Sequence, residues 1–167
     1  MIRVLFLCTG NICRSAYAER RARHLAPDLD VVSAGTHAMR GWGVDESMAV
    51  ELEARGGSAA DFSAQQLTES LARSAGLILC ATREHREYVT DAWPDLEPRT
   101  FVMKSYARAL ADSCLGAWSP VPASETSSLT RNDDIADPYR MGQPDAARAA
   151  DEIDAILTQI TRAPAAD

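Results

Sequence analysis

One octapeptide of this sequence combines residue types that can handle a phosphoryl group: Cys8-Thr9-Gly10-Asn11-Ile12-Cys13-Arg14-Ser15. A cysteine thiolate is a strong nucleophile, and the planar guanidinium of Arg14 can hold two phosphate oxygens. Gly10 and Asn11 tolerate a positive φ, so the loop can curl with its N–H groups pointing inward. Ser15 can donate its hydroxyl proton to the Cys8 sulfur. The octapeptide therefore predicts a phosphate-binding loop that begins at a nucleophile.

The position of the octapeptide supports this interpretation. The apolar run at residues 2–8 predicts a strand buried on both faces, and residues 14–25 have helical composition. A helix N-terminus offers unpaired N–H groups and a partial positive charge, which favour a phosphate and a thiolate. In open α/β sheets, ligands bind beyond the carboxyl ends of the strands. The alternative is that Cys8 is a buried strand residue and Arg14 a surface cation, which would leave the loop without chemistry.

Strand and helix patterns alternate along the chain. We predict strands at 29–34, 77–81 and 99–103, and helices at 45–56, 64–74, 82–91 and 144–162. This alternation predicts a doubly wound α/β fold, with about four parallel strands and helices on both faces. Residues 112–134 are rich in Ser, Pro, Asn and Asp and predict a long surface loop. We expect one domain over residues 1–162 and a frayed C-terminal tail over residues 163–167.

Composition excludes several classes of protein. The 167 residues carry a net charge of −7, from 24 acidic and 17 basic residues, which argues against non-specific nucleic-acid binding. The N-terminal apolar run is too short for a secretion signal or a membrane span. The four cysteines, at positions 8, 13, 80 and 114, form no zinc-binding pattern and suit a reducing compartment. We therefore expect a cytoplasmic protein with no membrane insertion, no metal and no cofactor.

The octapeptide resembles the signature of the low-molecular-weight protein tyrosine phosphatases, matching at Cys8, Gly10, Asn11, Cys13, Arg14 and Ser15. In that family the loop cradles phosphate, the first Cys attacks phosphorus, and the Arg binds the phosphoryl oxygens. Members usually have Pro where this chain has Ala16, an exchange that removes no catalytic group. Residues 33–36 resemble the end of the family's second strand, which implies a supporting hydrogen bond between Ser33 and Asn11.

The cleavage of an aryl phosphate also needs an acid, because the phenolate leaving group takes up a proton. Asp137-Pro138-Tyr139 follows the predicted long loop. By itself this is an ordinary turn sequence, since Asp before Pro is common in turns. The family places its general acid in such an Asp-Pro-aromatic segment. The resemblance therefore implies that Asp137 is the acid and that Tyr139 forms one wall for the incoming ring.

The resemblance further implies substrate-binding roles for Thr9, Gly10, Asn11, Ile12, Cys13 and Ser15. Family members that act on phosphoarginine carry Thr at the position of Ile12, whereas an apolar Ile suits a flat tyrosine ring. Ordinary loop packing explains Ile12 equally well. Trp42, in a Gly-Trp-Gly turn, lines the cleft rim in one interpretation and packs elsewhere in the other. A reversible disulfide between Cys8 and Cys13 would protect Cys8 from irreversible oxidation.

The sequence thus predicts an enzyme that hydrolyses protein phosphotyrosine through a cysteinyl-phosphate intermediate. Residues 44–47 and 137–141 most resemble bacterial members linked to exopolysaccharide export. That resemblance implies that the partner is the tyrosine-rich tail of a membrane kinase, and we expect the phosphatase to be a monomer.

Three other functions are compatible with such a loop. An arsenate reductase of the same fold relays a disulfide through two later cysteines that are close in sequence, which Cys80 and Cys114 are not. A non-catalytic phosphotyrosine-binding module would not need Cys8, Arg14 and Asp137 together. A carrier domain phosphorylated on its cysteine would not need Asp137.

Overall fold

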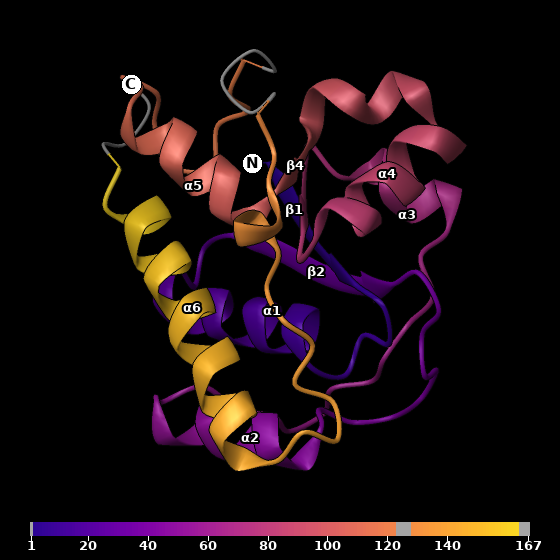
Figure 1. Ribbon diagram of the computed structural model, residues 1–167, viewed down its shortest axis with the longest axis vertical. Coiled ribbons are helices and arrows are strands. Elements are labelled where there is room, and N and C mark those ends of the chain that lie inside the picture. Colours follow the sequence, from indigo (N-terminus) through magenta and orange to yellow (C-terminus); the bar gives the residue numbers. More distant parts are fainter. Residues whose placement is uncertain (1, 123–127, 164–167) are drawn as a thin grey trace.

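A computed structural model describes residues 2–122 and 128–163 of the chain. Its centre is a parallel sheet of four strands in the order β2-β1-β3-β4 (Figure 1), which confirms the predicted fold class. The strands are β1 (Arg3–Cys8), β2 (Asp30–Gly35), β3 (Leu77–Cys80) and β4 (Thr100–Val102). Because β1 is flanked by β2 on one side and β3 on the other, the strand order reverses beside β1. In doubly wound folds this is the place where ligands bind.

Helices cover both faces of the sheet. One face carries α1 (Arg14–Leu25), α2 (Glu46–Ala54), α5 (Met103–Ala111) and α6 (Gln143–Thr161). The other face carries α3 (Glu69–Ser74), α4 (Arg83–Ala92) and the 3₁₀ helix η1 (Pro94–Arg99). A second 3₁₀ helix, η3 (Arg131–Asp133), lies in the chain before α6. Within the described residues, no helix is both long and apolar enough to cross a bilayer.

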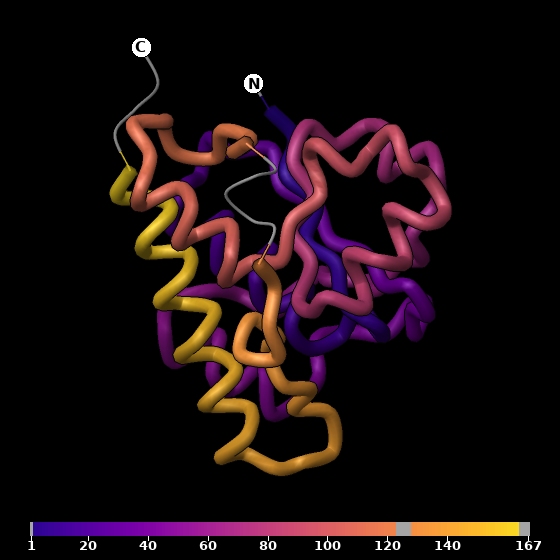
Figure 2. Tube along the Cα trace, turned by 45° about the horizontal axis from the view of Figure 1, so that its top comes forward, coloured from indigo at the N-terminus to yellow at the C-terminus, as the bar shows by residue number. Residues whose placement is uncertain are grey.

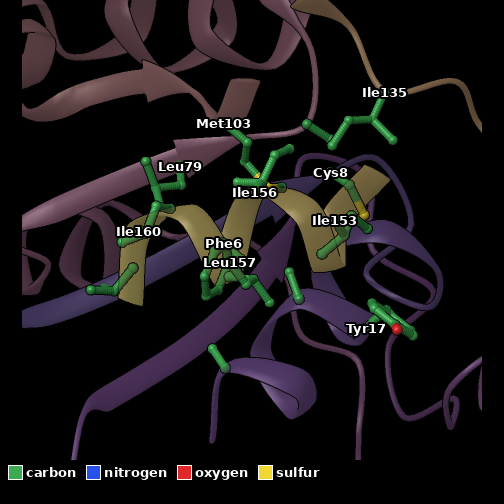
Figure 3. Close-up of a cluster of buried hydrophobic side chains, with 14 of the residues drawn as sticks. Phe6, Cys8, Tyr17, Leu79, Met103, Ile135, Ile153, Ile156, Leu157 and Ile160 are labelled. Atoms are coloured by element: carbon green, nitrogen blue, oxygen red, sulfur yellow. The ribbon is translucent and has the colours of Figure 1, made fainter. Parts of the chain in front are cut away.

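The two faces use alternate residues of β1, as the period of two in a strand requires. Val4, Phe6 and Cys8 belong to the larger apolar cluster, whereas Leu5 and Leu7 belong to the smaller one under α3 and α4. Figure 3 shows the larger cluster, in which the isoleucines of α6 pack over the sheet and Cys8 lies at one end. The nucleophile candidate is therefore the last residue of a strand fixed by packing on both sides.

Two predicted elements differ from the structure. The predicted helix over 64–74 is shorter, because α3 begins after Thr68, whose hydroxyl accepts a hydrogen bond from Leu71 N. The residues before Thr68 pair with the end of β2 instead: Gly35 N donates to Gln65 O (3.0 Å) and Leu67 N to Gly35 O (2.8 Å). The predicted strand over 99–103 is also too long, because Met103 is the first residue of α5, a helix that the sequence patterns do not predict.

The remaining boundaries agree to within one or two residues. Within the predicted loop at 112–134, residues 123–127 lie outside the described part of the chain, and the described remainder includes η3. Most of the predicted C-terminal tail, residues 164–167, also lies outside the described part.

Candidate active site

The loop between β1 and α1 turns its carbonyl groups outward. The carbonyl oxygens of Cys8, Thr9, Gly10 and Ile12 accept hydrogen bonds of 2.8–2.9 Å from backbone N–H groups in the segment 36–45. Within the described chain, no N–H group from Gly10 to Cys13 donates a backbone hydrogen bond. Such free N–H groups, beside the N-terminus of α1, are able to bind an anion.

Of the two positions predicted to tolerate a positive φ, only Asn11 uses one, with φ of 55°. Gly10 is not in the left-handed region, so the loop does not use the conformational freedom of this glycine. A Cβ at Gly10 would meet only ordinary contacts, the nearest being Ile12 Cγ1 at 3.6 Å. Gly35 is the more constrained glycine, because a Cβ there would lie 2.3 Å from Thr9 O. The end of β2 thus needs glycine so that the loop can pass close to it.

A chain of buried hydrogen bonds leads to the Cys8 sulfur. Asn11 Nδ2 donates to Ser15 Oγ (2.9 Å) and to Ser33 Oγ (2.8 Å), and Ser33 donates to Glu19 Oε2 (2.6 Å). Ser15 Oγ lies 2.9 Å from Cys8 Sγ. The implied bond between Asn11 and Ser33 is therefore present. Because Ser15 accepts from Asn11, its own proton can go to the sulfur or to Ala34 O, which lies farther away at 3.3 Å. A hydroxyl that donates to the sulfur favours a thiolate.

Glu19, which ends this series of hydrogen bonds, was not predicted to belong to the site. It lies four residues after Ser15 on α1, one helical turn away, and only 6% of it is exposed. The spacing was visible in the sequence, but nothing there showed that the serine from β2 would point toward it.

Arg14 joins the loop to the segment that carries Asp137. Its side chain is buried, Nη1 donates to Ile135 O (2.9 Å), and Nη2 lies 3.2 Å from Asp137 Oδ2. The buried Nε has no hydrogen-bond partner among the described residues. Asp137 is 52% exposed, and its Oδ1 accepts from Tyr139 N at 3.2 Å, as in an Asx turn. The structure thus brings together two motifs more than a hundred residues apart.

The chain from residue 128 onward runs past the sheet to the start of α6 (orange in Figure 2). It is fastened to the carboxyl end of β3, because Ile135 N donates to Ala81 O (2.9 Å) and Arg83 binds the carboxylate of Asp134. Burial disfavours the charged form of Asp133 and Asp134, but hydrogen bonds hold the pKa of each below its ordinary value. Both therefore remain ionised, so neither is a suitable proton donor.

A cavity of about 170 Å³ opens between these parts, lined by Cys8, Thr9, Gly10, Ile12, Cys13, Arg14, His37, Met39, Asp137 and Tyr139. Ile12, Met39 and Tyr139 give it apolar walls over a polar floor. Trp42 does not line this cavity; it is 55% exposed, and its backbone N–H donates to Met39 O (3.1 Å). His37, expected near the rim but without a catalytic role, and Met39, which was not predicted, both line it. They do so because their backbone anchors the loop, which no sequence spacing reveals.

The other cysteines are placed away from the chemistry or are kept protonated. Burial, followed by the negative charge of Asp45, raises the pKa of the Cys13 thiol well above its usual range. Cys80 is buried in β3 and Cys114 is exposed, and neither lines the cavity. A wider opening of about 630 Å³ between α5 and α6 contains no residue of the loop.

Fold and site define an α/β protein with a loop of free N–H groups at the strand-order reversal and a carboxylate on the cavity that the loop lines. The family model of the low molecular weight phosphotyrosine protein phosphatases matches residues 3–125. The probable low molecular weight protein-tyrosine-phosphatase AmsI of Erwinia amylovora is 35% identical over 99 residues, which are 59% of this chain and 69% of that protein. The chain therefore belongs to this family.

Further comparisons extend over more of the chain. The low molecular weight protein-tyrosine-phosphatase Etp of Escherichia coli K12 is 31% identical over 140 residues, 84% of this chain and 79% of Etp. The crystal structure of AmsI superposes with a TM-score of 0.79 at 25% identity, covering 99% of this chain and 95% of that one. The YwlE arginine phosphatase of Geobacillus stearothermophilus gives a TM-score of 0.78 at 25% identity, covering 96% and 91%.

Proposed function

We propose that this protein hydrolyses phosphotyrosine in proteins, with Cys8 as nucleophile and Asp137 as general acid and base. The observation that carries the proposal is that Cys8, Arg14 and Asp137 converge on one cavity, beside loop N–H groups that are free to bind an anion. Family membership and the printed names of AmsI and Etp support the same activity.

In the first step, the Cys8 thiolate attacks phosphorus while the bond from phosphorus to the phenolic oxygen breaks. Asp137 gives its proton to the departing phenolate, so tyrosine leaves neutral and a cysteinyl-phosphate remains. In the second step, the Asp137 carboxylate takes a proton from water, whose oxygen attacks phosphorus and releases inorganic phosphate and the Cys8 thiolate. Arg14 and the loop N–H groups stabilise the negative charge on the transferring oxygens in both steps.

The walls of the cavity favour an aromatic substrate. Ile12, Met39 and Tyr139 can contact the two faces of a phenyl ring, whereas a phosphoarginine would place a polar guanidinium against them. The similarity to an arginine phosphatase makes phosphoarginine the substrate against which the proposal is tested. Arsenate reduction has no support from the site, because Cys80 and Cys114 lie outside the cavity.

The decisive experiment compares phosphate release from phosphotyrosine, phosphoserine and phosphoarginine peptides, with arsenate reduction as a fourth assay. We expect phosphotyrosine to be preferred, with full activity in the presence of a chelator. Cys8→Ser should abolish turnover while still binding a phosphotyrosine peptide, because the loop and Arg14 remain. Appreciable turnover by Cys8→Ser, or a preference for phosphoarginine, would contradict the proposal. Cys114→Ser is the matched control and should keep wild-type activity, because Cys114 lies outside the site.

We also propose that Cys13 protects the nucleophile from oxidation. Both cysteines lie in one loop and are unpaired in the structure. Peroxide would oxidise the Cys8 thiolate to a sulfenic acid, and attack by Cys13 sulfur would form the Cys8–Cys13 disulfide with loss of water. A dithiol would then regenerate both thiols. After peroxide and dithiol treatment, wild type should recover its activity and Cys13→Ser should not. Equal recovery by the two proteins would show that Cys13 has no protective role.

The resemblance at residues 44–47 and 137–141 supports a finer proposal about the partner. We expect the protein to act as a cytoplasmic monomer on the phosphorylated tyrosine-rich tail of a membrane kinase. Dephosphorylation of such a tail by the wild type, set against Cys8→Ser, tests this directly.

A further inference from the structure

His85 is a buried histidine next to the site that the proposed mechanism does not use. It is 4% exposed, and its ring lies between two threonine hydroxyls. Nδ1 is 2.7 Å from Thr82 Oγ1, and Nε2 is 2.9 Å from Thr9 Oγ1. Thr82 caps α4 directly after β3, and Thr9 directly follows Cys8. The ring therefore links the ends of two adjacent strands, at the point where the strand order reverses.

This link supplies something that the loop backbone lacks. Toward β2, the carbonyls of residues 8–12 are held by backbone hydrogen bonds from segment 36–45. Toward β3 and α4, residues 9–13 make no backbone hydrogen bond within the described chain. The contact between Thr9 and His85 is the hydrogen bond that holds the loop on that side. One turn further along α4, Tyr88 packs edge-on against His37, with ring centroids 6.1 Å apart. Helix α4 therefore contacts both the loop and its backbone anchor.

The His85 ring is suited to fixing the orientation of the two threonine hydroxyl groups. Burial, and after it the positive charge of Arg14, lowers the pKa of His85 to about 4, so the imidazole is neutral at neutral pH. A neutral imidazole has one donor and one acceptor, so the two hydroxyls must take complementary orientations. With its proton on Nε2, the ring donates to Thr9 Oγ1 and leaves the Thr9 proton free to point into the cavity that Thr9 lines.

We infer that His85 is a positioning residue for phosphoryl transfer, which acts by orienting Thr9 and holding the start of the phosphate-binding loop against α4. The inference rests on the proposed function, since it assigns His85 a part in that same reaction. It predicts that the contribution of His85 passes through the Thr9 hydroxyl rather than through the general stability of α4.

Two substitutions of His85 separate these roles. In His85→Gln the new amide group would lie near the position of Nε2, whereas in His85→Asn the shorter side chain reaches only toward Thr82. His85→Gln should therefore stay within about two-fold of wild type in kcat/KM for phosphotyrosine, while His85→Asn should fall roughly five- to ten-fold, the value of one hydrogen bond. Thr9→Val should give a similar loss of kcat/KM. The double variant Thr9→Val/His85→Asn should be no less active than the less active of the two single variants. His24→Gln, at an exposed position near the end of α1, is the control.

Two further measurements distinguish a positioning role of His85 from an effect on folding and from a failure of the proposed function. Denaturant unfolding of each variant shows whether activity follows stability. In ¹⁵N NMR of the wild type, the His85 ring nitrogens should shift when inorganic phosphate binds, and Thr9→Val should remove that shift. Equal losses for His85→Gln and His85→Asn, multiplying losses in the double variant, or an unmoved ring would each overturn the inference. If the wild type fails to hydrolyse phosphotyrosine, the proposed function fails, while phosphate binding and the ring shift still decide the role of His85.

Discussion

The phosphate-binding loop and the segment that carries Asp137 meet at one cavity, but they are held in different ways. Four loop carbonyls accept backbone hydrogen bonds, and the side chains of Asn11 and Ser15 are fully buried. Asp137 is half exposed, and it contacts the loop through Arg14. The loop is thus built into the fold, whereas the carboxylate that we propose as the acid lies on a separate segment of the chain. Changes in the loop should alter folding and binding together, and changes at Asp137 should alter the chemistry alone.

Asp137→Asn should have the largest effect, and it isolates the contribution of the segment that carries Asp137. General-acid help is typically worth ~10²–10⁴-fold, so kcat for phosphotyrosine should fall by about that range. An aryl phosphate with a very acidic phenol should lose much less, because its phenolate leaves without a proton. Peptide binding to a Cys8→Ser background should change little, since the loop stays intact. The measurement is kcat for a series of aryl phosphates with both proteins.

Asp134→Asn is the matched control, because Asp134 lies on the same segment as Asp137. Asp134 is paired with Arg83 and does not line the cavity, so its loss should reduce kcat only slightly and equally for every leaving group. If instead the Asp137→Asn penalty is the same for all leaving groups, Asp137 is not the acid. A leaving-group dependence that appears in Asp134→Asn would assign the role to Asp134.

Gly35→Ala tests whether the loop depends on its close approach to the end of β2. An added Cβ would lie 2.3 Å from Thr9 O and 3.0 Å from Asn11 N, so the loop or the end of β2 must move. Overpacking of this kind costs about 1–3 kcal/mol of unfolding free energy. We expect at least a ten-fold loss in kcat/KM together with weaker binding of inorganic phosphate, because the loop N–H groups would no longer converge.

Gly43→Ala is its control, since a Cβ there would meet nothing within 4 Å and the backbone is not left-handed. Stability and activity of Gly43→Ala should match wild type. A Gly35→Ala protein that binds phosphate as well as wild type would show that the loop does not depend on its close approach to β2.

The same contrast explains what could be predicted from the sequence. The loop is one contiguous string between a strand and a helix, so its residue types and position sufficed to place Cys8 and Arg14. The segment that carries Asp137 could be identified only by resemblance, because nothing local distinguishes Asp137 from other turn aspartates. The family model match ends before it, at residue 125.

The supporting residues were beyond the reach of spacing arguments. Glu19 and His85 each gain a contact with a residue that the sheet brings close, Ser33 of β2 and Thr9 after β1. The stretch before Thr68 has helical composition, yet its backbone pairs with Gly35 and the side chain of Asn11. In both cases, tertiary hydrogen bonding decides what local propensity does not.

His85, which joins the loop to the start of α4, should also make the stability of the protein depend on pH. The charged groups that face the ring are Arg14, which lowers its pKa beyond the effect of burial, and Asp137 and Asp134, which oppose that shift. The folded pKa is about 4, against an ordinary value of 6.5. Between these values the unfolded chain binds a proton that the folded protein does not. The free energy of unfolding should therefore decrease as pH falls from 6.5 toward 4.

The slope due to this one group approaches ~1.4 kcal/mol per pH unit. Denaturant unfolding of wild type and His85→Gln across this window measures it, and the variant should lose that part of the slope. Asp133 and Asp134 do not obscure the result, because their pKa values are lowered and their contributions disappear only at more acidic pH. If His85→Gln keeps the wild-type slope, folding does not lower the pKa of His85, and burial between Thr82 and Thr9 does not hold the ring neutral below pH 6.5.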